Sequence, residues 1–311
     1  MKIYQVDAFT DRPFAGNPAA VVPLDASWHA AGEPTDAWMQ ALAAEMNLSE
    51  TALVAPHADG AEGAFELRWF TPATEVSLCG HATVATAHVL YETGRLAADL
   101  EARFHTLSGV LRARRPARGT IELDFPAAPA EPWTLSEEAA RALGVDPAVL
   151  AEGAVGTARK AAGDGQVIVE LPTAADVLAV APDMAALGRL GRLGWIVTAH
   201  AAGLEQAAGA DFVSRFFAPA LGVDEDPVTG SAHCALVPWW CRRLDRERVV
   251  GYQASARGGT VDGRLGGDGD RSTNDRVLLR GGAVTVLEGE LTHSSCSARL
   301  GSSPAARRAG R

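Results

Sequence analysis

The sequence predicts an α+β protein made of two similar lobes, and two observations support this prediction. The first is length, because 311 residues suffice for two domains of about 150 residues, each with its own core. The second is an internal repeat. Residues 65–73 (FELRWFTPA) match residues 212–220 (FVSRFFAPA), with Phe, Arg, Phe, Pro and Ala in register. Each copy has the pattern of a strand, a loop and a helix that begins with small residues.

The helix starts continue the repeat. Cys79–Thr83 (CGHAT) lies opposite Pro227–Ser231 (PVTGS), with one extra residue in the second copy. A helix start leaves backbone N–H groups unpaired and carries partial positive charge, so it suits an anionic group. Two lobes that direct such starts toward a shared cleft would hold a small carboxylate-bearing ligand from both sides.

Composition excludes several classes of protein. The chain is 47% hydrophobic and 21% charged, as in ordinary globular proteins, and its net charge of −10 argues against nucleic-acid or anionic-membrane partners. No segment approaches the roughly 18 apolar residues of a membrane helix, and the N-terminus begins as a strand rather than as a signal peptide. We therefore expect a cytoplasmic protein. The four cysteines have neither CxxC nor metal-knuckle spacing, so we expect reduced thiols.

Hydrophobic periodicity predicts the elements of the first lobe, residues 1–125. A helix over residues 36–46 should end at Asn47, which tolerates the left-handed conformation. Glu50 lies at the entrance to an apolar strand, where a carboxylate needs either a partner or a role. A second helix runs from the CGHAT motif to near Gly94. The predicted strands are 3–9, 19–24, 48–54, 65–70, 101–106, 109–115 and 120–125.

The second lobe is predicted over residues 126–292, after a Pro-Ala linker at 126–132. A helix follows Ser231, and residues 251–260 with 262–265 have the pattern of a closing strand pair. A polar insert at 266–275 lengthens one turn, and residues 293–311, which include Cys296, are predicted to form a disordered tail. The other predicted helices are 136–143, 174–178 and 184–190, and the other strands are 156–159, 166–171, 194–199, 211–217, 276–279 and 283–291.

Five motifs in order resemble the PhzF family of phenazine-biosynthesis-like isomerases, and the resemblance runs from residue 1 to about 291. The motifs lie at residues 7–22, 47–51 (NLSET), 70–72 (FTP), 79–83 (CGHAT) and 224–232 (DEDPVTGSA). The resemblance implies the diaminopimelate epimerase-like fold, in which each lobe wraps a curved mixed sheet around a central helix. It also implies an active site between the lobes that uses no metal or organic cofactor, and a homodimer.

Three residues match the family's catalytic group. Glu50 matches the glutamate that moves a proton between substrate carbons. A carboxyl group partly buried between lobes is suited to accept and return one proton within a turnover. His81 and Asp226 come from opposite lobes, and we expect them to form a hydrogen-bonded pair that holds the substrate.

Four further residues match the family's substrate-binding positions. Gly80 and Gly230 would bring backbone N–H groups to a substrate carboxylate, because glycine lets the backbone approach closely. Ser231 would add its hydroxyl group. Asn17, in a Gly-Asn-Pro turn, is expected to support the same site, although turn chemistry alone explains it equally well.

Other reactive residues are interpreted more conservatively. Amino-acid epimerases of this fold use one thiol from each lobe, and Cys79 lies where the first would be. Its repeat partner is Pro227, so a two-thiol mechanism is disfavoured. His81 and His88 are seven residues apart, whereas zinc ligands on helices are usually four apart, so no metal site is predicted. His233 and the pair Trp239-Trp240 are assigned to the core.

Together these features predict a cofactor-independent isomerase that relocates a proton on a small carboxylate-bearing metabolite. The resemblance suggests a cyclic diene acid such as dihydrohydroxyanthranilate. The alternative within enzymes is an epimerase or racemase of amino or imino acids, which would need a second base. The alternative outside enzymes is a ligand-binding relative that retained the fold without catalysis. Substrate and pathway stay open.

Overall fold

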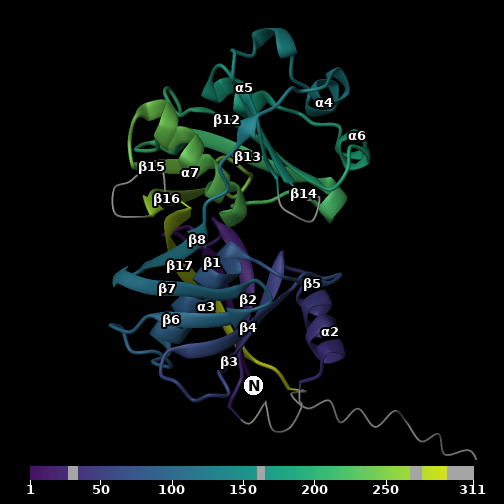
Figure 1. Ribbon diagram of the computed structural model, residues 1–311. Coiled ribbons are helices and arrows are strands. Elements are labelled where there is room, and N and C mark those ends of the chain that lie inside the picture. Colours follow the sequence, from purple (N-terminus) through teal and green to yellow (C-terminus); the bar gives the residue numbers. More distant parts are fainter. Residues whose placement is uncertain (27–33, 160–164, 267–274, 293–311) are drawn as a thin grey trace, which may run out of the picture.

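The computed structural model describes residues 1–26, 34–159, 165–266 and 275–292. The predicted disordered tail, with Cys296, and all but the ends of the predicted polar insert lie outside these residues. Figure 1 shows two lobes stacked one on the other, the first in purple and blue and the second in teal and green. A mixed sheet with helices runs through both, so the α+β class is confirmed.

The first lobe wraps its strands around the buried helix α3. This helix spans Gly80–Glu92 and packs against β1, β2, β3, β7, β8 and β17. The N-terminal helix α2 (Asp36–Met46) begins with a Thr35 side-chain cap and ends at Asn47 in the left-handed region, as predicted. The strands of this lobe are β1 (Lys2–Ala8), β2 (Asn17–Pro23), β3 (Glu50–Pro56), β4 (Ala64–Phe70), β5 (Glu75–Val76), β6 (Ala102–Thr106), β7 (Gly109–Ala117) and β8 (Thr120–Pro126).

The second lobe is built in the same way around α7 (Gly230–Leu244), which packs on β15, β16 and β17. Its shorter helices are α4 (Glu137–Leu143), α5 (Ala174–Ala179) and α6 (Met184–Arg189), with 3-10 turns at Pro147–Val149, Glu205–Ala207 and Pro219–Leu221. Its strands are β9 (Glu131–Pro132), β10 (Val155–Arg159), β11 (Gly165–Glu170), β12 (Leu193–His200), β13 (Phe212–Ala218), β14 (Val223–Glu225), β15 (Arg248–Gln253), β16 (Gly259–Gly266) and β17 (Arg276–Glu290).

Strand pairing confirms the internal repeat. β2–β3 is parallel, β3–β4 and β4–β5 are antiparallel, and β4–β6 is parallel. The series β11–β12, β12–β13, β13–β14 and β13–β15 repeats this pattern. The repeated arginines have matching partners: Arg68 bonds Glu75 at 2.7 and 2.8 Å, and Arg215 bonds Glu225 at 2.8 and 3.0 Å. Each bidentate pair fixes the strand that leads to the central helix.

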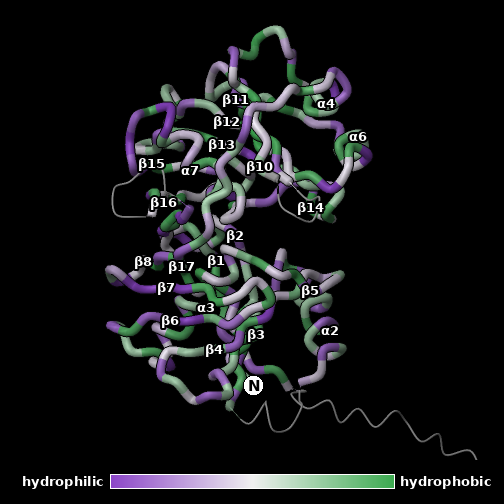
Figure 2. Tube along the Cα trace, in the orientation of Figure 1, coloured by the Kyte–Doolittle hydropathy of each residue, from purple (hydrophilic) through white to green (hydrophobic). Residues whose placement is uncertain are grey.

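Hydropathy follows the burial expected for such sheets. Figure 2 shows hydrophilic residues along β7, and in this strand Leu111 and Ala113 are buried while the arginines between and after them are not. The largest core cluster contains the apolar residues of α3 and α7, including Trp239 and Trp240. Both tryptophans and His233 are buried in α7, which confirms their assignment to the core.

The last strand differs from the prediction, because β17 is continuous where two strands were expected. Residues 280–282, which include Gly281 and Gly282, fall between the two predicted strands. In the structure the chain stays extended, and a Cβ at Gly281 would lie 2.4 Å from the ring of Phe9, while one at Gly282 would lie 2.6 Å from the carbonyl of Thr10. The glycines therefore serve close packing rather than a turn.

The continuous strand also joins the two parts of the sequence. β17 pairs with β16, with β8 and, over residues 283–290, with β1. A strand from the second part of the chain therefore lies beside the first strand of the chain. The division into lobes at residues 125 and 126 stays a proposal.

Two other boundaries differ from the sequence prediction. The strand predicted over 251–260 is interrupted, because β15 ends at Gln253 and Gly258, at φ +65°, turns the chain into β16. Within this turn Arg257 contacts Asp7 at 2.7 Å and the carbonyl of Gly16 at 2.8 Å. The predicted linker 126–132 contains the short strand β9, which pairs with β10.

Two expectations concern single features of the described residues. No helix among them combines the length and the apolar character that a membrane crossing requires. Among the described cysteines, Cys79, Cys234 and Cys241 form no disulfide.

Candidate active site

The N-termini of the two central helices meet between the lobes. A Cβ added at Gly80 would lie 3.0 Å from the Cα of Gly230, and the reverse distance is the same. The N-cap residues, Cys79 and Thr229, make no side-chain hydrogen bond to their helices. The first backbone N–H groups of both helices therefore remain available to a ligand, and both macrodipoles favour an anion there.

A cavity of about 230 Å³ lies at this junction and is lined from both lobes. Its polar wall contains six of the seven predicted site residues: Glu50, Gly80, His81, Asp226, Gly230 and Ser231. Its apolar wall is formed by Val76, Leu78, Phe125, Phe216, Ala218, Leu221 and Val223. The arrangement suits a small ligand with an acidic end and an apolar body.

Glu50 and His81 form an ion pair at the polar wall. Glu50 is the first residue of β3, and its side chain is 16% exposed. Its Oε2 lies 3.1 Å from Nε2 of His81, the second residue of α3. Burial alone would lower the pKa of His81, but the adjacent Cys79 and Glu50 outweigh it and raise that pKa well above the ordinary value. The Glu50 carboxylate beside it therefore favours the protonated form of His81.

Asn17 is not among the residues that line the cavity, but it contacts two of them. It is fully buried. Its Nδ2 lies 2.8 Å from Oδ1 of Asp226, 2.9 Å from the carbonyl of Val228 and 3.1 Å from Nδ1 of His81, and Ser49 donates to its Oδ1 at 3.2 Å. The expected pair of His81 and Asp226 is linked through the amide of Asn17, which contacts both side chains. Asn17 therefore connects residues of the two lobes.

Asp226 lies on the loop before α7 and is held by the start of that helix. Thr229 donates its hydroxyl to Oδ2 of Asp226 at 2.5 Å. Burial, with the nearby charge of Glu50, raises the pKa of Asp226 to about 6 against the opposing effects of His81 and of its hydrogen bonds. The buried Gln253 fixes the loop, since it donates to the carbonyl of Asp226 at 2.7 Å and accepts from the N–H of Thr229 at 2.9 Å.

Ser231 presents its hydroxyl from the second position of α7. Its Oγ accepts a hydrogen bond from Nε2 of Gln166 at 3.1 Å. The hydroxyl hydrogen is then free to point toward a ligand in the cavity. Gln166 and Gln253 were not predicted, although each is a buried amide within an apolar strand, and such an amide needs a polar partner.

Comparison with known proteins places the chain in a family. The family model described as phenazine biosynthesis-like protein, PhzC-PhzF, matches residues 6–289. The chain belongs to this family. A protein of Pseudomonas aeruginosa named "uncharacterized isomerase" is 45% identical over 291 residues, which cover 94% of this chain and 98% of that protein. Relatives with such names support an isomerase-type function.

Solved structures give the same result for the PhzF fold. A PhzF-family protein from Enterococcus faecalis is 35% identical, with a TM-score of 0.77 and coverage of 93% of this chain and 98% of that one. A hydroxyproline epimerase from Agrobacterium vitis, 12% identical with a TM-score of 0.57 and coverage of 93% and 91%, shares the fold. The family resemblance and the epimerase-like fold predicted from the sequence are confirmed.

Cys79 of this PhzF-family chain is a buried thiol on the cavity wall, 6% exposed. Burial and the charge of Glu50 raise its pKa to about 11, so the thiol is protonated at neutral pH. Its counterpart in the second lobe is Thr229 and not Pro227, because both Cys79 and Thr229 are N-caps of the central helices. The longer second loop shifts the register by two residues from the one predicted.

Proposed function

We propose that the protein is a cofactor-independent isomerase that relocates a proton on a small acid bound between the lobes. One observation carries this proposal: the carboxylate of Glu50 lines the same cavity as two helix starts whose N-caps leave their N–H groups open. The first feature can carry a proton and the second can hold an anion.

Substrate binding begins with the carboxylate. The substrate carboxylate is expected near the junction of α3 and α7. It can accept hydrogen bonds there from the backbone N–H groups of Gly80 and Gly230 and from the hydroxyl of Ser231. The apolar wall then accepts the carbon skeleton. A cavity of about 230 Å³ fits a single ring with its substituents, and a cyclic diene acid such as dihydrohydroxyanthranilate is the substrate that we propose.

The proton step uses Glu50 alone as base and then as acid. Its carboxylate accepts a proton as a C–H bond breaks, and the released electron pair shifts the conjugated double bonds. The same carboxyl group then delivers that proton to another carbon, so Glu50 ends as it began. The positive charge of His81 at 3.1 Å orients Glu50, and Asn17 orients His81.

Two alternatives have less support. An amino- or imino-acid epimerase of this fold needs a second base opposite the first, and Thr229 occupies the position where a second thiol would be. Its hydroxyl donates to Asp226 and is thereby occupied. A non-catalytic ligand-binding protein would not require Glu50 and a cationic His81 inside the cavity. The isomerase names of the relatives also favour an enzyme.

Deuterium incorporation tests the proposal. The protein is incubated in D2O with a panel of cyclic diene acids, amino acids and imino acids, and deuterium at carbon is followed by NMR. Exchange that survives Cys79→Ala but is abolished by Glu50→Gln supports the isomerase. Exchange lost with Cys79→Ala supports the epimerase, and ligand binding without exchange of any acid supports the non-catalytic alternative.

Three further predictions accompany this function. We propose a homodimer, a cytoplasmic location and a division into two lobes near residue 125. Light scattering of the purified chain tests the dimer. Limited proteolysis tests the division, because cleavage should concentrate at residues 126–130 if the lobes are separate units.

A further inference from the structure

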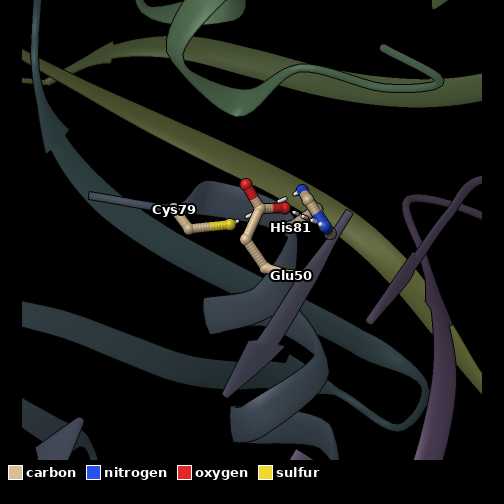
Figure 3. Close-up of side chains that lie close together, drawn as sticks. All are labelled: Glu50, Cys79 and His81. Atoms are coloured by element: carbon tan, nitrogen blue, oxygen red, sulfur yellow. Dashed lines mark hydrogen bonds and ion pairs between the residues drawn. The ribbon is translucent and has the colours of Figure 1, made fainter. Parts of the chain in front are cut away.

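Three side chains of different ligand chemistry converge on the polar wall of the cavity. One oxygen of Glu50, the sulfur of Cys79 and one ring nitrogen of His81 all lie within 4.8 Å of one another. Within this cluster the Cys79 Sγ is 3.6 Å from His81 Nδ1, and Glu50 Oε2 is 3.1 Å from His81 Nε2. Figure 3 shows the three side chains pointing toward one another from the start of β3 and the start of α3.

Two atoms of this cluster are buried without a hydrogen-bond partner. They are Oε2 of Glu50 and Nε2 of His81, which face each other but lack hydrogen-bonding geometry. His81 is only 4% exposed. The contact between the two atoms is an ion pair without a hydrogen bond, so a ligand that bonds to either atom would lower the free energy of the folded state.

We propose that Glu50, Cys79 and His81 form a binding site for a thiophilic divalent cation, represented by Zn²⁺, and that the bound cation inhibits the enzyme. Zinc takes thiolate, imidazole and carboxylate ligands in tetrahedral geometry, at about 2.0–2.3 Å. Those bond lengths place the ligand atoms about 3.5 Å apart. The sulfur and Nδ1 already have this separation, and the widest part of the cluster must close by about 1 Å.

All three residues line the cavity, so a water molecule could fill the fourth coordination position. On binding, the thiol of Cys79 would release its proton to solvent, His81 would bind through an unprotonated ring nitrogen, and no electron transfer would be involved. The cluster should bind Mg²⁺ and Ca²⁺ poorly, because these ions require about six oxygen ligands and the cluster offers one carboxylate. The site therefore selects soft cations.

Inhibition rests on the proposed function, because it follows from the role of Glu50 as the proton carrier. A cation bound to its carboxylate occupies the electron pair that would accept the substrate proton. It also blocks the approach of substrate to the wall between Glu50 and Cys79. The proton chemistry itself remains independent of metal, and the cation acts only as an inhibitor.

Cobalt spectroscopy tests the site without reference to activity. The full chain, stripped with a chelator, is titrated with Co²⁺ and then with competing Zn²⁺, and the thiolate-to-cobalt charge-transfer band is recorded. We expect the band in the wild type, displacement by Zn²⁺ but not by Mg²⁺, and an affinity at least about 10-fold lower in Cys79→Ser. The proposal would be overturned if wild type and Cys79→Ser gave the same charge-transfer band with the same cobalt affinity.

Two control variants exclude other sources of the signal. Cys241→Ser removes another buried thiol, and His57→Asn removes one of two stacked histidines beside Asp59, whose carboxylate lies 3.0 Å from His57. Both should titrate as the wild type does. Loss of the band in either control, with its retention in Cys79→Ser, would contradict the assignment. Circular dichroism confirms that each variant is folded.

The activity test separates this proposal from the proposed function. Each protein is compared with its own exchange rate without zinc. At a Zn²⁺ concentration that abolishes deuterium exchange by the wild type, Cys79→Ser should keep its rate. If exchange occurs but no cobalt band forms, the cation site is refuted and the isomerase stands. If the band forms but no acid exchanges, the isomerase is refuted and the cation site stands.

Discussion

The contact between the two helix starts makes Gly80→Ala a sensitive perturbation. A Cβ at this position would lie 3.0 Å from the Cα of Gly230, whereas carbon atoms normally approach to about 3.5–4.0 Å. The two helix N-termini must therefore separate by a few tenths of an ångström or more. Overpacking of this kind costs about 1–3 kcal/mol. Alanine recovers up to about 1 kcal/mol as the better helix former, so a net loss of about 1 kcal/mol is expected.

Activity should respond more strongly than stability. Misplacement of about 1 Å can cost about 100-fold in rate. The displacement of the two N–H groups expected here is smaller, so it should reduce kcat/KM for exchange about 10-fold. Urea unfolding and deuterium incorporation measure the two effects. Gly188→Ala in α6 is the matched control, because the nearest atoms to its Cβ are 3.9 Å away; it should be neutral or stabilising. Equal stability and activity of the two variants would refute the close contact.

Three further changes test other parts of the site. Asn17→Ala leaves the groups that Asn17 contacts without that partner, which costs about 1–3 kcal/mol of stability for each buried group. Exchange by the folded variant should therefore fall at least about 10-fold. The pKa of Asp226 is raised to about 6, so the rate should change near pH 6, and Asp226→Asn should remove this change. Burial lowers the pKa of His233 from 6.5 to about 4. Between pH 6.5 and 4 the unfolded chain therefore binds a proton on His233 that the folded chain does not bind, and the free energy of unfolding falls by about 3 kcal/mol over this range. Urea unfolding of His233→Leu should lack this fall.

Much of the fold could be predicted because periodicity and local chemistry agree over most elements. The repeat at Arg68 and Arg215 indicated two equivalent lobes, and the structure gives both arginines the same type of partner. The prediction failed at residues 280–282, which include Gly281 and Gly282, where it placed a gap between two strands and the structure has one continuous strand. Only the packing of Phe9 against the extended strand explains these glycines, and that contact joins distant parts of the sequence.

The site was predictable where a motif carries its own chemistry and not where long-range contacts decide. Glu50 was singled out by its position at the start of an apolar strand and by its match to a motif of the PhzF family, and the structure places it on the cavity wall. The role of Asn17 depends on partners in the other lobe, which sequence spacing does not reveal. The same holds for Cys79, whose proximity to Glu50 and His81 arises only when β3 and α3 meet.

The most direct test of the central claim is deuterium incorporation by wild type and Glu50→Gln with one acid that the wild type turns over. The substitution keeps the size of the side chain but removes the group that accepts a proton. Single-turnover exchange at carbon should fall at least about 1000-fold, while substrate binding by calorimetry is retained. Full exchange by folded Glu50→Gln would contradict the claim that Glu50 carries the proton.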